Sequence, residues 1–307
     1  MVDNKECRFR IKDNSICKNN PYKLGKSLKR IPVNSEHFLN DQYHLIWSYM
    51  RLHLIMDKII TLTMNPVIDK DTSVAGIKPN TKLRCATPKY YAGGGGINVS
   101  RALKKLGGES LCMYLAGGPT GTHLEQLVSD DRITQEVISI EGWTRENLSV
   151  TDTLTNLQFR FGVPGPHVIE EEWKMVLRLI QGHLSQGDFL VASGKLPPGV
   201  PADFYVQVSK IIQKIGAKLV LDTSGRALLP SMKAKIYMMK PNLGELSIVC
   251  GVDFISAFEL ESLCKKFLEE IDCEVLVVSM GPKGALLATR DEMDHIMAPT
   301  VCILYTS

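Results

Sequence analysis

The sequence predicts an α/β protein whose mostly parallel sheet carries helices on both faces. Short apolar runs, typical of strands that are covered on both sides, occur at residues 58–63, 111–116, 189–193, 218–221, 236–239, 275–279 and 285–288. Between them, apolar residues recur at helical spacing in residues 97–106, 170–183, 201–215, 243–250 and 257–270. This alternation of strands and helices predicts a doubly wound sheet.

Boundary signals support these elements along the chain. The β-branched run at residues 58–63 stops at Asn65-Pro66, a dipeptide typical of turns. Four glycines, residues 93–96, stand directly before the helix at 97–106. Residues 279–284, Ser-Met-Gly-Pro-Lys-Gly, predict a turn between the last two strands.

Two segments do not follow this rhythm. Polar and apolar residues alternate in residues 72–91 and 147–163, which predicts strands outside the main sheet. We expect them to form a small β lid, spanning about residues 69–91 and 145–163, over a ligand at the strand ends.

Residues 1–55 differ from the rest of the chain. They hold 10 Lys and Arg against 5 Asp and Glu, which leaves 26 basic and 28 acidic residues for residues 56–307. They also show no sustained helical or strand period. We interpret them as an appendage to a domain that starts at Met56, which is then the natural initiator; the alternative is a basic arm that binds a partner. Because the domain itself has no clustered excess of Lys and Arg, the sequence argues against nucleic-acid binding.

The composition indicates a reduced, cytoplasmic protein without a membrane span. The 8 cysteines are scattered, with no Cys-x-x-Cys pair and no Cys/His spacing of the zinc kind. An apolar run at residues 44–56 is interrupted by Arg51 and His53 and is shorter than the roughly 18 to 20 residues of a spanning helix.

The glycine run is the first candidate site. Glycine lets the backbone approach a ligand closely, and the N–H groups at a helix start favour an anion or a hydroxyl-rich group. A tight turn without a ligand is the simpler interpretation of the glycines alone. Asn98, whose side chain both donates and accepts hydrogen bonds, favours recognition of a polyol.

Eight motifs follow one another in a fixed order. They are Thr-Leu-Thr-Met-Asn-Pro at 61–66 with Asp69, Lys-Leu-Arg-Cys at 82–85, Gly-Gly-Gly-Gly-Ile-Asn-Val-Ser-Arg-Ala at 93–102, Ala-Gly-Gly-Pro-Thr-Gly at 116–121, Trp-Thr-Arg-Glu-Asn-Leu at 143–148, Ser-Gly-Lys-Leu-Pro-Pro-Gly at 193–199, Lys-Pro-Asn-Leu-Gly-Glu at 240–245 and the turn at 279–284. On these motifs, residues 56 to about 299 resemble the ribokinase family of sugar kinases, in its phosphofructokinase B branch. The motifs at 82–85 and 143–148 are most similar to those of the minor bacterial 6-phosphofructokinases.

The resemblance implies a ribokinase-like fold and an ATP-dependent, Mg²⁺-requiring phosphorylation of a sugar phosphate. The expected reaction converts fructose 6-phosphate to fructose 1,6-bisphosphate, a step of glycolysis. The alternatives are a fructose 1-phosphate or tagatose 6-phosphate kinase, which share the glycine signature and the lid, and a non-catalytic sugar-phosphate binding protein. The family often forms dimers through the lid, so we expect a homodimer formed by the lid strands.

The resemblance also implies where the sugar phosphate binds. Asp69 would accept hydrogen bonds from sugar hydroxyls, with a turn or helix-cap aspartate as the alternative. Three cations in or beside the lid would hold the phosphate, namely Lys82, Arg145 and Arg160. For each of them, an ordinary solvated surface side chain is the alternative. The other residues of the implied substrate site are Gly94, Gly95, Asn98 and Ser193.

A second set of residues is implied at the nucleotide. Lys240, Asn242 and Glu245 match the family's Asn-x-x-Glu pattern, in which Asn and Glu help to place Mg²⁺ and its waters near the ATP phosphates. A helix N-cap followed by a first-turn glutamate uses the same spacing. The turn that passes along the nucleotide in the family contains Ser279, Gly281 and Gly284.

Two departures from the family pattern stand out. Lys195 replaces the second serine of the common Ser-Gly-Ser-Leu-Pro sequence, and either a phosphate contact or a solvent-facing lysine fits that position. The Gly-Ala-Gly-Asp motif, whose N–H groups stabilise the transferring phosphate and whose aspartate takes the acceptor proton, does not occur. We interpret residues 300–307 as a foreign or frameshifted tail, and we therefore assign no catalytic base and expect little activity. The final helices, which cover one side of the sheet in the family, would be missing with that motif.

Overall fold

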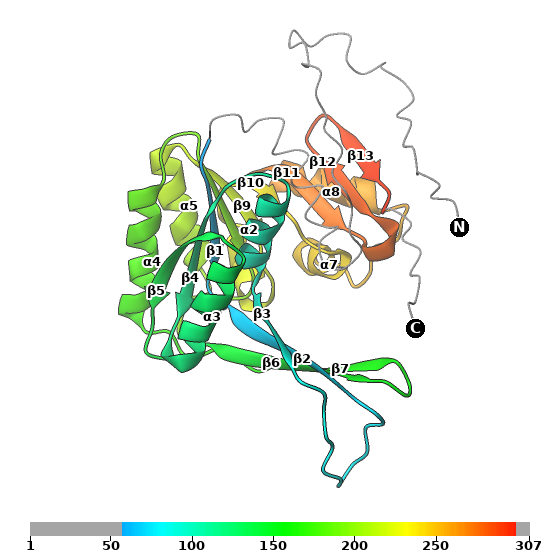
Figure 1. Ribbon diagram of the computed structural model, residues 1–307. Helices are drawn as coiled ribbons and strands as arrows, with labels where there is room; N and C mark the ends of the chain where they lie inside the picture. Colours follow the sequence, from blue (N-terminus) through cyan, green and yellow to red (C-terminus); the bar gives the residue numbers. More distant parts are fainter. Residues whose placement is uncertain (1–56, 299–307) are drawn as a thin grey trace, which may run out of the picture. The chain divides into compact units, whose positions relative to one another are not determined.

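A nine-stranded sheet is the centre of residues 57–298, the part of the chain that the computed structural model describes (Figure 1). Its strand order is β13-β12-β11-β10-β9-β8-β1-β4-β5. Neighbouring strands from β5 to β11 are parallel, and β12 and β13 extend the sheet with antiparallel pairing. The strands are β1 (Ile59–Thr63), β4 (Leu111–Ala116), β5 (Thr134–Ser139), β8 (Phe189–Ser193), β9 (Lys218–Asp222), β10 (Ile236–Met239), β11 (Cys273–Ser279), β12 (Ala285–Ala288) and β13 (Met293–Ile296).

Helices pack on both faces of this sheet, as predicted. The helices are α2 (Gly95–Lys105), α3 (Gly118–Asp130), α4 (Glu170–His183), α5 (Phe204–Ile215), α6 (Leu228–Ser231), α7 (Leu243–Cys250) and α8 (Leu260–Glu270), with 3-10 turns η1 (Gly225–Ala227) and η2 (Gly281–Lys283). Apolar side chains of α2 and α3 pack on one face, and those of α4 to α8 pack on the other. None of these helices is long and apolar enough to cross a membrane.

The fold class and the predicted strands of the main sheet are confirmed, whereas α3, the one-turn helix α6 and the edge strands β5 and β13 were not predicted. α3 begins Gly-Pro-Thr-Gly and buries only Gly121, Leu124 and Val128, so it lacks a continuous apolar stripe. β5 lies at the edge of the sheet and buries only Ile138, and β13 at the other edge buries none of its residues. Edge strands need little apolar sequence, because one side of each has no neighbouring strand.

A separate four-stranded sheet has the order β3-β2-β6-β7. It is built from β2 (Val67–Val74), β3 (Lys89–Gly93), β6 (Arg145–Asp152) and β7 (Leu157–Phe161). The predicted second sheet is therefore present, but the strand predicted over 72–91 is wrong in extent. Residues 75–88 form no strand, because Pro79 and Pro88 cannot donate to a ladder and Asn80 has a φ of 55°. In Figure 1 the small sheet projects below the main one, on the side where β1 ends.

Asp152 joins the loop after β2 to the turn between β6 and β7. Its carboxylate accepts hydrogen bonds from the backbone N–H groups of Leu154 (2.9 Å), Ile77 (3.1 Å) and Gly76 (3.0 Å). These donors hold the pKa of the Asp152 carboxyl below its usual range, with Leu154 and Ile77 as the main causes. The ionised carboxylate therefore stabilises this end of the small sheet.

We expect Asp152→Asn to loosen this end of the small sheet at neutral pH, because a neutral amide has one acceptor oxygen instead of two charged ones. Since the folded pKa lies below the ordinary 3.8, the contribution of the carboxylate is present above about pH 4 and is lost as the pH falls through the folded value. Hydrogen exchange at the amides of Gly76, Ile77 and Leu154 should be faster in the variant at pH 7. The exposed Asp253→Asn change should leave it unaltered. Equal exchange in Asp152→Asn and the unchanged chain would refute the role.

Candidate active site

Many of the predicted site residues gather where the strand order reverses. The chain runs from β1 to β4 and β5 on one side, and returns to place β8 on the other side of β1. In an open α/β sheet, ligands bind beyond the carboxyl ends of the strands at such a reversal. β1 ends at Thr63, and β8 ends at Ser193, which is buried.

The glycine signature lies across these two strand ends. A Cβ atom on Gly95 would be 2.0 Å from Ser193 Oγ, and one on Gly96 would be 2.7 Å from Thr63 Oγ1 and from the Leu62 carbonyl oxygen. Gly94 has a φ of +129°, which L side chains rarely adopt. The first turn of α2 therefore contacts the main sheet directly. Thr63 Oγ1 already accepts one of its N–H groups, from Ile97 at 3.1 Å.

Asn98 lies in the first turn of α2, and its amide is oriented by Arg101. Arg101 Nη1 donates to Asn98 Oδ1 at 2.8 Å, while Nη2 donates to the Ala92 carbonyl (2.7 Å) and Nε contacts Asp131 (2.8 Å). With its oxygen engaged in this way, Asn98 presents its amide NH₂ as a donor. The Asn98 oxygen keeps a second lone pair, so the donor and acceptor roles that the sequence suggested both remain available.

Asp69 is a half-buried residue on β2, not a turn or helix-cap residue. Asn147, its register partner on β6, donates to Asp69 Oδ1 at 3.1 Å. Gly93 leaves room for the carboxylate, since a Cβ there would be 2.3 Å from Asp69 Oδ2. Burial raises the pKa of Asp69, and the Asn147 hydrogen bond opposes the rise. Asn147 belongs to a recognised motif but had not been assigned to the site.

The three predicted phosphate-binding cations have different surroundings. Arg145, half-buried at the start of β6, donates to the backbone carbonyls of Val163 (3.1 Å), Asn65 (3.2 Å) and Pro66 (3.3 Å). Burial lowers its pKa, and nearby Asp69 opposes this. Arg160 is exposed on β7, where its Nε donates to Gln158 at 2.6 Å, and its charge also reaches Asp69. Lys82 is exposed in the strand-free segment 75–88, apart from the small sheet that holds the other two.

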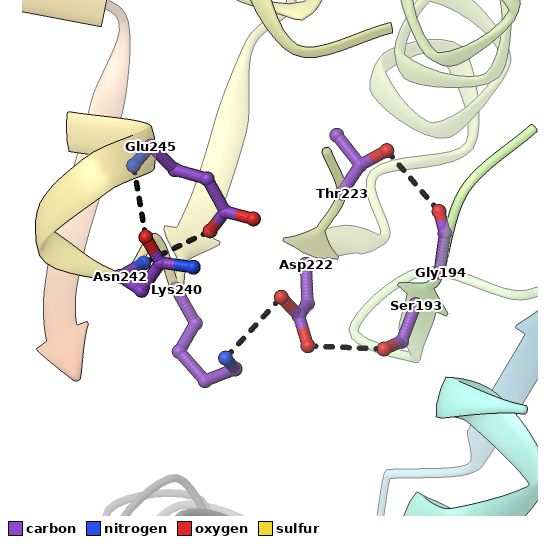
Figure 2. Close-up of polar contacts among 7 residues, drawn as sticks. All are labelled: Ser193, Gly194, Asp222, Thr223, Lys240, Asn242 and Glu245. Atoms are coloured by element: carbon purple, nitrogen blue, oxygen red, sulfur yellow. Dashed lines mark hydrogen bonds and ion pairs between the residues drawn. The ribbon is translucent and has the colours of Figure 1, made fainter. Parts of the chain in front are cut away.

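Ser193, Asp222 and Lys240 form a second cluster, at the ends of the three adjacent strands β8, β9 and β10 (Figure 2). Ser193 Oγ donates to Asp222 Oδ2 at 3.1 Å, and Lys240 Nζ lies 3.2 Å from Asp222 Oδ1. Lys240 is only 8% exposed. A buried ammonium group needs a partner, and the carboxylate supplies it. Asp222 was missed at the sequence level, although an aspartate directly after the apolar run 218–221 is a usable signal.

Hydroxyl groups fix the turn after β8. The Gly194 carbonyl accepts from Thr223 Oγ1 (3.1 Å, Figure 2) and from Tyr205 Oη (3.3 Å). The Gly194 N–H donates to the Asp222 carbonyl oxygen at 2.8 Å, and Gly194 has a φ of +114°. Lys195, the departure from the family pattern, follows with an exposed side chain.

Asn242 and Glu245 form a capping box at the start of α7. The Glu245 N–H donates to Asn242 Oδ1, and the Asn242 N–H donates to Glu245 Oε2, each at 2.9 Å (Figure 2). The helix N-cap with a first-turn glutamate, which the sequence offered as the alternative for these two residues, is therefore present. It leaves Glu245 Oε1 outside the cap. Figure 2 shows the box beside Lys240, in the same part of the structure as Asp222.

The turn after β11 runs alongside this box. The Ser279 N–H donates to the Pro241 carbonyl at 2.9 Å, and Asn242 and Ser279 pair as an isolated parallel bridge. Gly281 is exposed and has a φ of +59°, and a Cβ atom at this position would have open space around it. Gly284 is required by the chain itself, because a Cβ there would be 1.9 Å from the Ile296 carbonyl oxygen.

A doubly wound sheet with a small second sheet beside its switch point belongs to the α/β proteins that bind ligands beyond the carboxyl ends of their strands. Residues 58–303 match the model of the pfkB family carbohydrate kinases, so the chain belongs to that family.

Three relatives show the extent of the similarity. The ATP-dependent 6-phosphofructokinase isozyme 2 of Mycobacterium tuberculosis is 41% identical over 233 residues, which cover 76% of this chain and 68% of the relative. The 1-phosphofructokinase of Bacillus subtilis is 32% identical over 246 residues, 78% of each chain. The crystal structure of Escherichia coli phosphofructokinase-2 in complex with fructose-6-phosphate superposes with a TM-score of 0.77 and 34% identity, covering 80% of this chain and 82% of that one.

The contact at Gly95 generates a stability prediction. Gly95→Ala should lower the free energy of unfolding by about 1–3 kcal/mol, because its methyl group would overlap Ser193 and displace the first turn of α2. Urea unfolding measures the change. Gly182→Ala is the matched control within α4, where a Cβ meets nothing within 4 Å, and it should be neutral or stabilising by up to about 1 kcal/mol. Equal free energies of unfolding for the two variants would contradict the close contact between Gly95 and Ser193.

Proposed function

We propose that this chain binds a sugar phosphate and ATP for transfer of the γ-phosphoryl group to a sugar hydroxyl, with fructose 6-phosphate as the sugar substrate. The observation that carries the proposal is the contact of the glycine signature with Ser193, which brings the first turn of α2, the small sheet and the Ser193–Asp222–Lys240 cluster to one switch point. Phosphoryl transfer depends mainly on positioning and electrostatics, and this arrangement supplies both.

The sugar side of the site is formed by the small sheet and the first turn of α2. Asp69 accepts hydrogen bonds from sugar hydroxyls, Asn98 donates to one, and Gly94 and Gly95 allow the sugar to approach the backbone. Ser193 lies at the boundary with the nucleotide side. For the phosphate of the substrate, we favour Arg145 and Arg160, whose charges reach Asp69, over Lys82.

The nucleotide side is formed by Lys240, the capping box and the turn at residues 279–284. Lys240 and the backbone around Ser279, Gly281 and Gly284 face the ATP phosphates in this proposal. Mg²⁺ prefers oxygen ligands and keeps much of its water, and Asn242, Glu245 and Asp222 offer such oxygens. Within residues 57–298 no group of three or more His, Cys, Asp and Glu is arranged to hold a metal, and with two carboxylates and one amide available, water would have to complete the coordination shell of the ion. When bound, the ion would neutralise charge on the phosphates.

The absence of a Gly-Ala-Gly-Asp sequence limits the rate that we propose for this chain. Removing one oxyanion donor typically costs about 10²- to 10³-fold in rate, and this motif provides several donors together with the base. We therefore propose binding of both substrates with little turnover. The second candidate is a sugar-phosphate binding protein without catalysis. Fructose 1-phosphate and tagatose 6-phosphate are the alternative sugars.

Isothermal titration of the full chain with each sugar phosphate tests the proposal. Fructose 6-phosphate should bind most tightly, and Asp69→Asn should weaken it about 10- to 100-fold through loss of charged hydrogen bonds. Because burial raises the pKa of Asp69, the affinity should fall as the pH falls through that raised value, at a higher pH than for an ordinary aspartate, and Asp69→Asn should abolish this dependence. Asp253→Asn should behave like the unchanged chain.

The outcomes separate the candidates. Tighter binding of fructose 1-phosphate or tagatose 6-phosphate would replace the sugar but keep the reaction class. Binding of the sugar without ATP would favour the non-catalytic protein. Rapid turnover in a coupled assay would contradict the low-activity proposal, and binding of no sugar phosphate would contradict both candidates.

We further propose that two copies pair through the small sheet. Alternation along β7 puts Leu157, Phe159 and Phe161 on one face and Arg160 on the other, and the three apolar side chains are 39% to 59% exposed. Exposed apolar residues on an edge strand are typical of a surface that another chain covers.

Phe159→Glu with Phe161→Glu should shift the protein from dimer to monomer, because the two charges would have to be buried at the interface. Sedimentation velocity measures the state. The control, Phe258→Glu, changes a side chain that is 98% exposed and lies between α7 and α8, and it should leave the dimer intact. If the chain without substitutions were monomeric at micromolar concentration, the proposal of a dimer would be wrong.

A further inference from the structure

Asn147 on β6 has both ends of its side-chain amide engaged. The backbone N–H of Val163 donates to Asn147 Oδ1 at 3.2 Å, and Asn147 Nδ2 donates to Asp69 Oδ1 at 3.1 Å. Because an N–H group can only donate, the amide oxygen must face Val163 and the NH₂ group must face the carboxylate. The two hydrogen bonds therefore fix the direction in which the amide points.

Val163 is itself held by a neighbouring side chain of β6. Arg145 lies two residues before Asn147, and hence on the same face of the strand, and it donates to the Val163 carbonyl at 3.1 Å. The segment that leaves β7 is thus attached to β6 through both the N–H and the C=O group of one residue. This attachment makes Asn147 a fixed support rather than a side chain that could turn away.

Asp69 is the group on which this support acts. It pairs with Asn147 in the ladder between β2 and β6, and register partners point to the same face of a sheet. The other carboxylate oxygen, Oδ2, lies against Gly93, where a Cβ atom would be 2.3 Å away. One oxygen of Asp69 therefore faces Asn147, and the other faces the start of the glycine signature.

We propose that Asn147 is a positioning residue for sugar recognition: its amide fixes one oxygen of the Asp69 carboxylate so that the other is aimed at a sugar hydroxyl. This inference rests on the proposed role of Asp69 as the acceptor for sugar hydroxyls. A carboxylate without a fixed partner rotates among several orientations. Fixing it before the sugar arrives lowers the entropy cost of binding.

Asn147 also acts on the charge of Asp69. Burial is the largest influence and raises the pKa of Asp69, and the hydrogen bond from Asn147 is the strongest of the influences that lower this pKa. Asp71 also raises the pKa, whereas Arg145 and Arg160 lower it less than Asn147 does. Removing the amide donor should therefore raise the pKa of Asp69 further and make the carboxylate easier to protonate.

The strand register shows which other titratable and charged groups surround Asp69. Those on its face of the small sheet are Asp71 on β2, Lys89 and Tyr91 on β3, Arg145 on β6 and Arg160 on β7. The opposite face packs against α3, where His123 contacts Tyr90. Substitutions at Asn147 leave all of these groups in place, so a change in the titration of Asp69 reports the loss of the amide.

Carbon-detected NMR titration of the Asp69 carboxyl in the ligand-free full chain tests the proposal. The signal is assigned by its loss in Asp69→Asn. Its midpoint should lie at a higher pH in Asn147→Ala than in the unchanged chain, because the donor is gone. Asn147→Asp should raise the pH of first protonation further, because it keeps an acceptor for Val163 but puts a second carboxylate beside Asp69.

The two variants separate positioning from a merely structural role. If Asn147 served only to hold Val163, the isosteric aspartate would preserve that role and alanine would lose it. The positioning role predicts the reverse order at Asp69, with a larger effect from aspartate than from alanine. The control is Asn80→Asp, which adds the same charge at an exposed position in the segment 75–88 and should leave the midpoint of Asp69 unaltered.

Isothermal titration adds the binding readout. Asn147→Ala should bind fructose 6-phosphate about 3- to 10-fold more weakly than the unchanged chain at pH 7, and the difference should widen as the pH is lowered. The affinity for ATP should stay the same, because Asn147 belongs to the sugar side of the proposed site.

The outcomes distinguish this inference from the proposed function. An Asp69 midpoint or a fructose 6-phosphate affinity equal to that of the unchanged chain would overturn the inference and leave the proposed function intact. Equal weakening of ATP binding would show a general structural role and overturn it as well. If the unchanged chain binds no sugar phosphate, the proposed function fails, and raised midpoints would still uphold the control of Asp69 by Asn147.

A measurement on the unchanged chain covers the case in which the variants fail to fold. The side-chain NH₂ signals of Asn147 should shift with pH at the same midpoint as the Asp69 carboxyl, because a hydrogen-bond donor responds to the charge of its acceptor. Asn147 signals that stay constant while Asp69 titrates would overturn the inference without any substitution.

Discussion

The close contact between the first turn of α2 and the ends of β1 and β8 is the constraint on which the rest of the site depends. A side chain at Gly95 or Gly96 would overlap Ser193 or Thr63, so only glycine permits this approach. The small sheet is fixed by the same contact, because β2 leaves the main sheet shortly after β1 and β3 leads directly into α2. One short segment thus positions the helix start, the strand ends and Asp69 together.

Asp222 connects the two sides of the proposed site. Its two carboxylate oxygens contact Ser193 and Lys240 (Figure 2), which we propose lie at the boundary of the two sides and on the nucleotide side, respectively. The half-buried carboxylate neutralises an almost buried ammonium group, an arrangement that fixes both side chains. Asn242 and Glu245 cap α7 with two hydrogen bonds that leave Glu245 Oε1 outside the cap. The capping role therefore does not exclude the proposed role of these residues near Mg²⁺.

The uneven covering of the sheet has a simple origin in the chain's order. α2 and α3 follow early strands and cover the half of one face that lies over β1, β4, β5 and β8. The later helices, α5 to α8, all pack on the other face.

Sequence alone determined the fold class, seven of the nine main-sheet strands and the pfkB family resemblance, because continuous apolar runs and ordered motifs are local properties of the chain. It did not reveal α3, β5 or the strand-free stretch 75–88, where edge positions and prolines weaken the local pattern. The tertiary structure decided which motif residues meet: Asp69 with Asn147, Asn98 with Arg101, and Ser193 with Asp222 and Lys240. These contacts join residues that strand order brings together from distant parts of the chain, and spacing along the sequence does not encode that order.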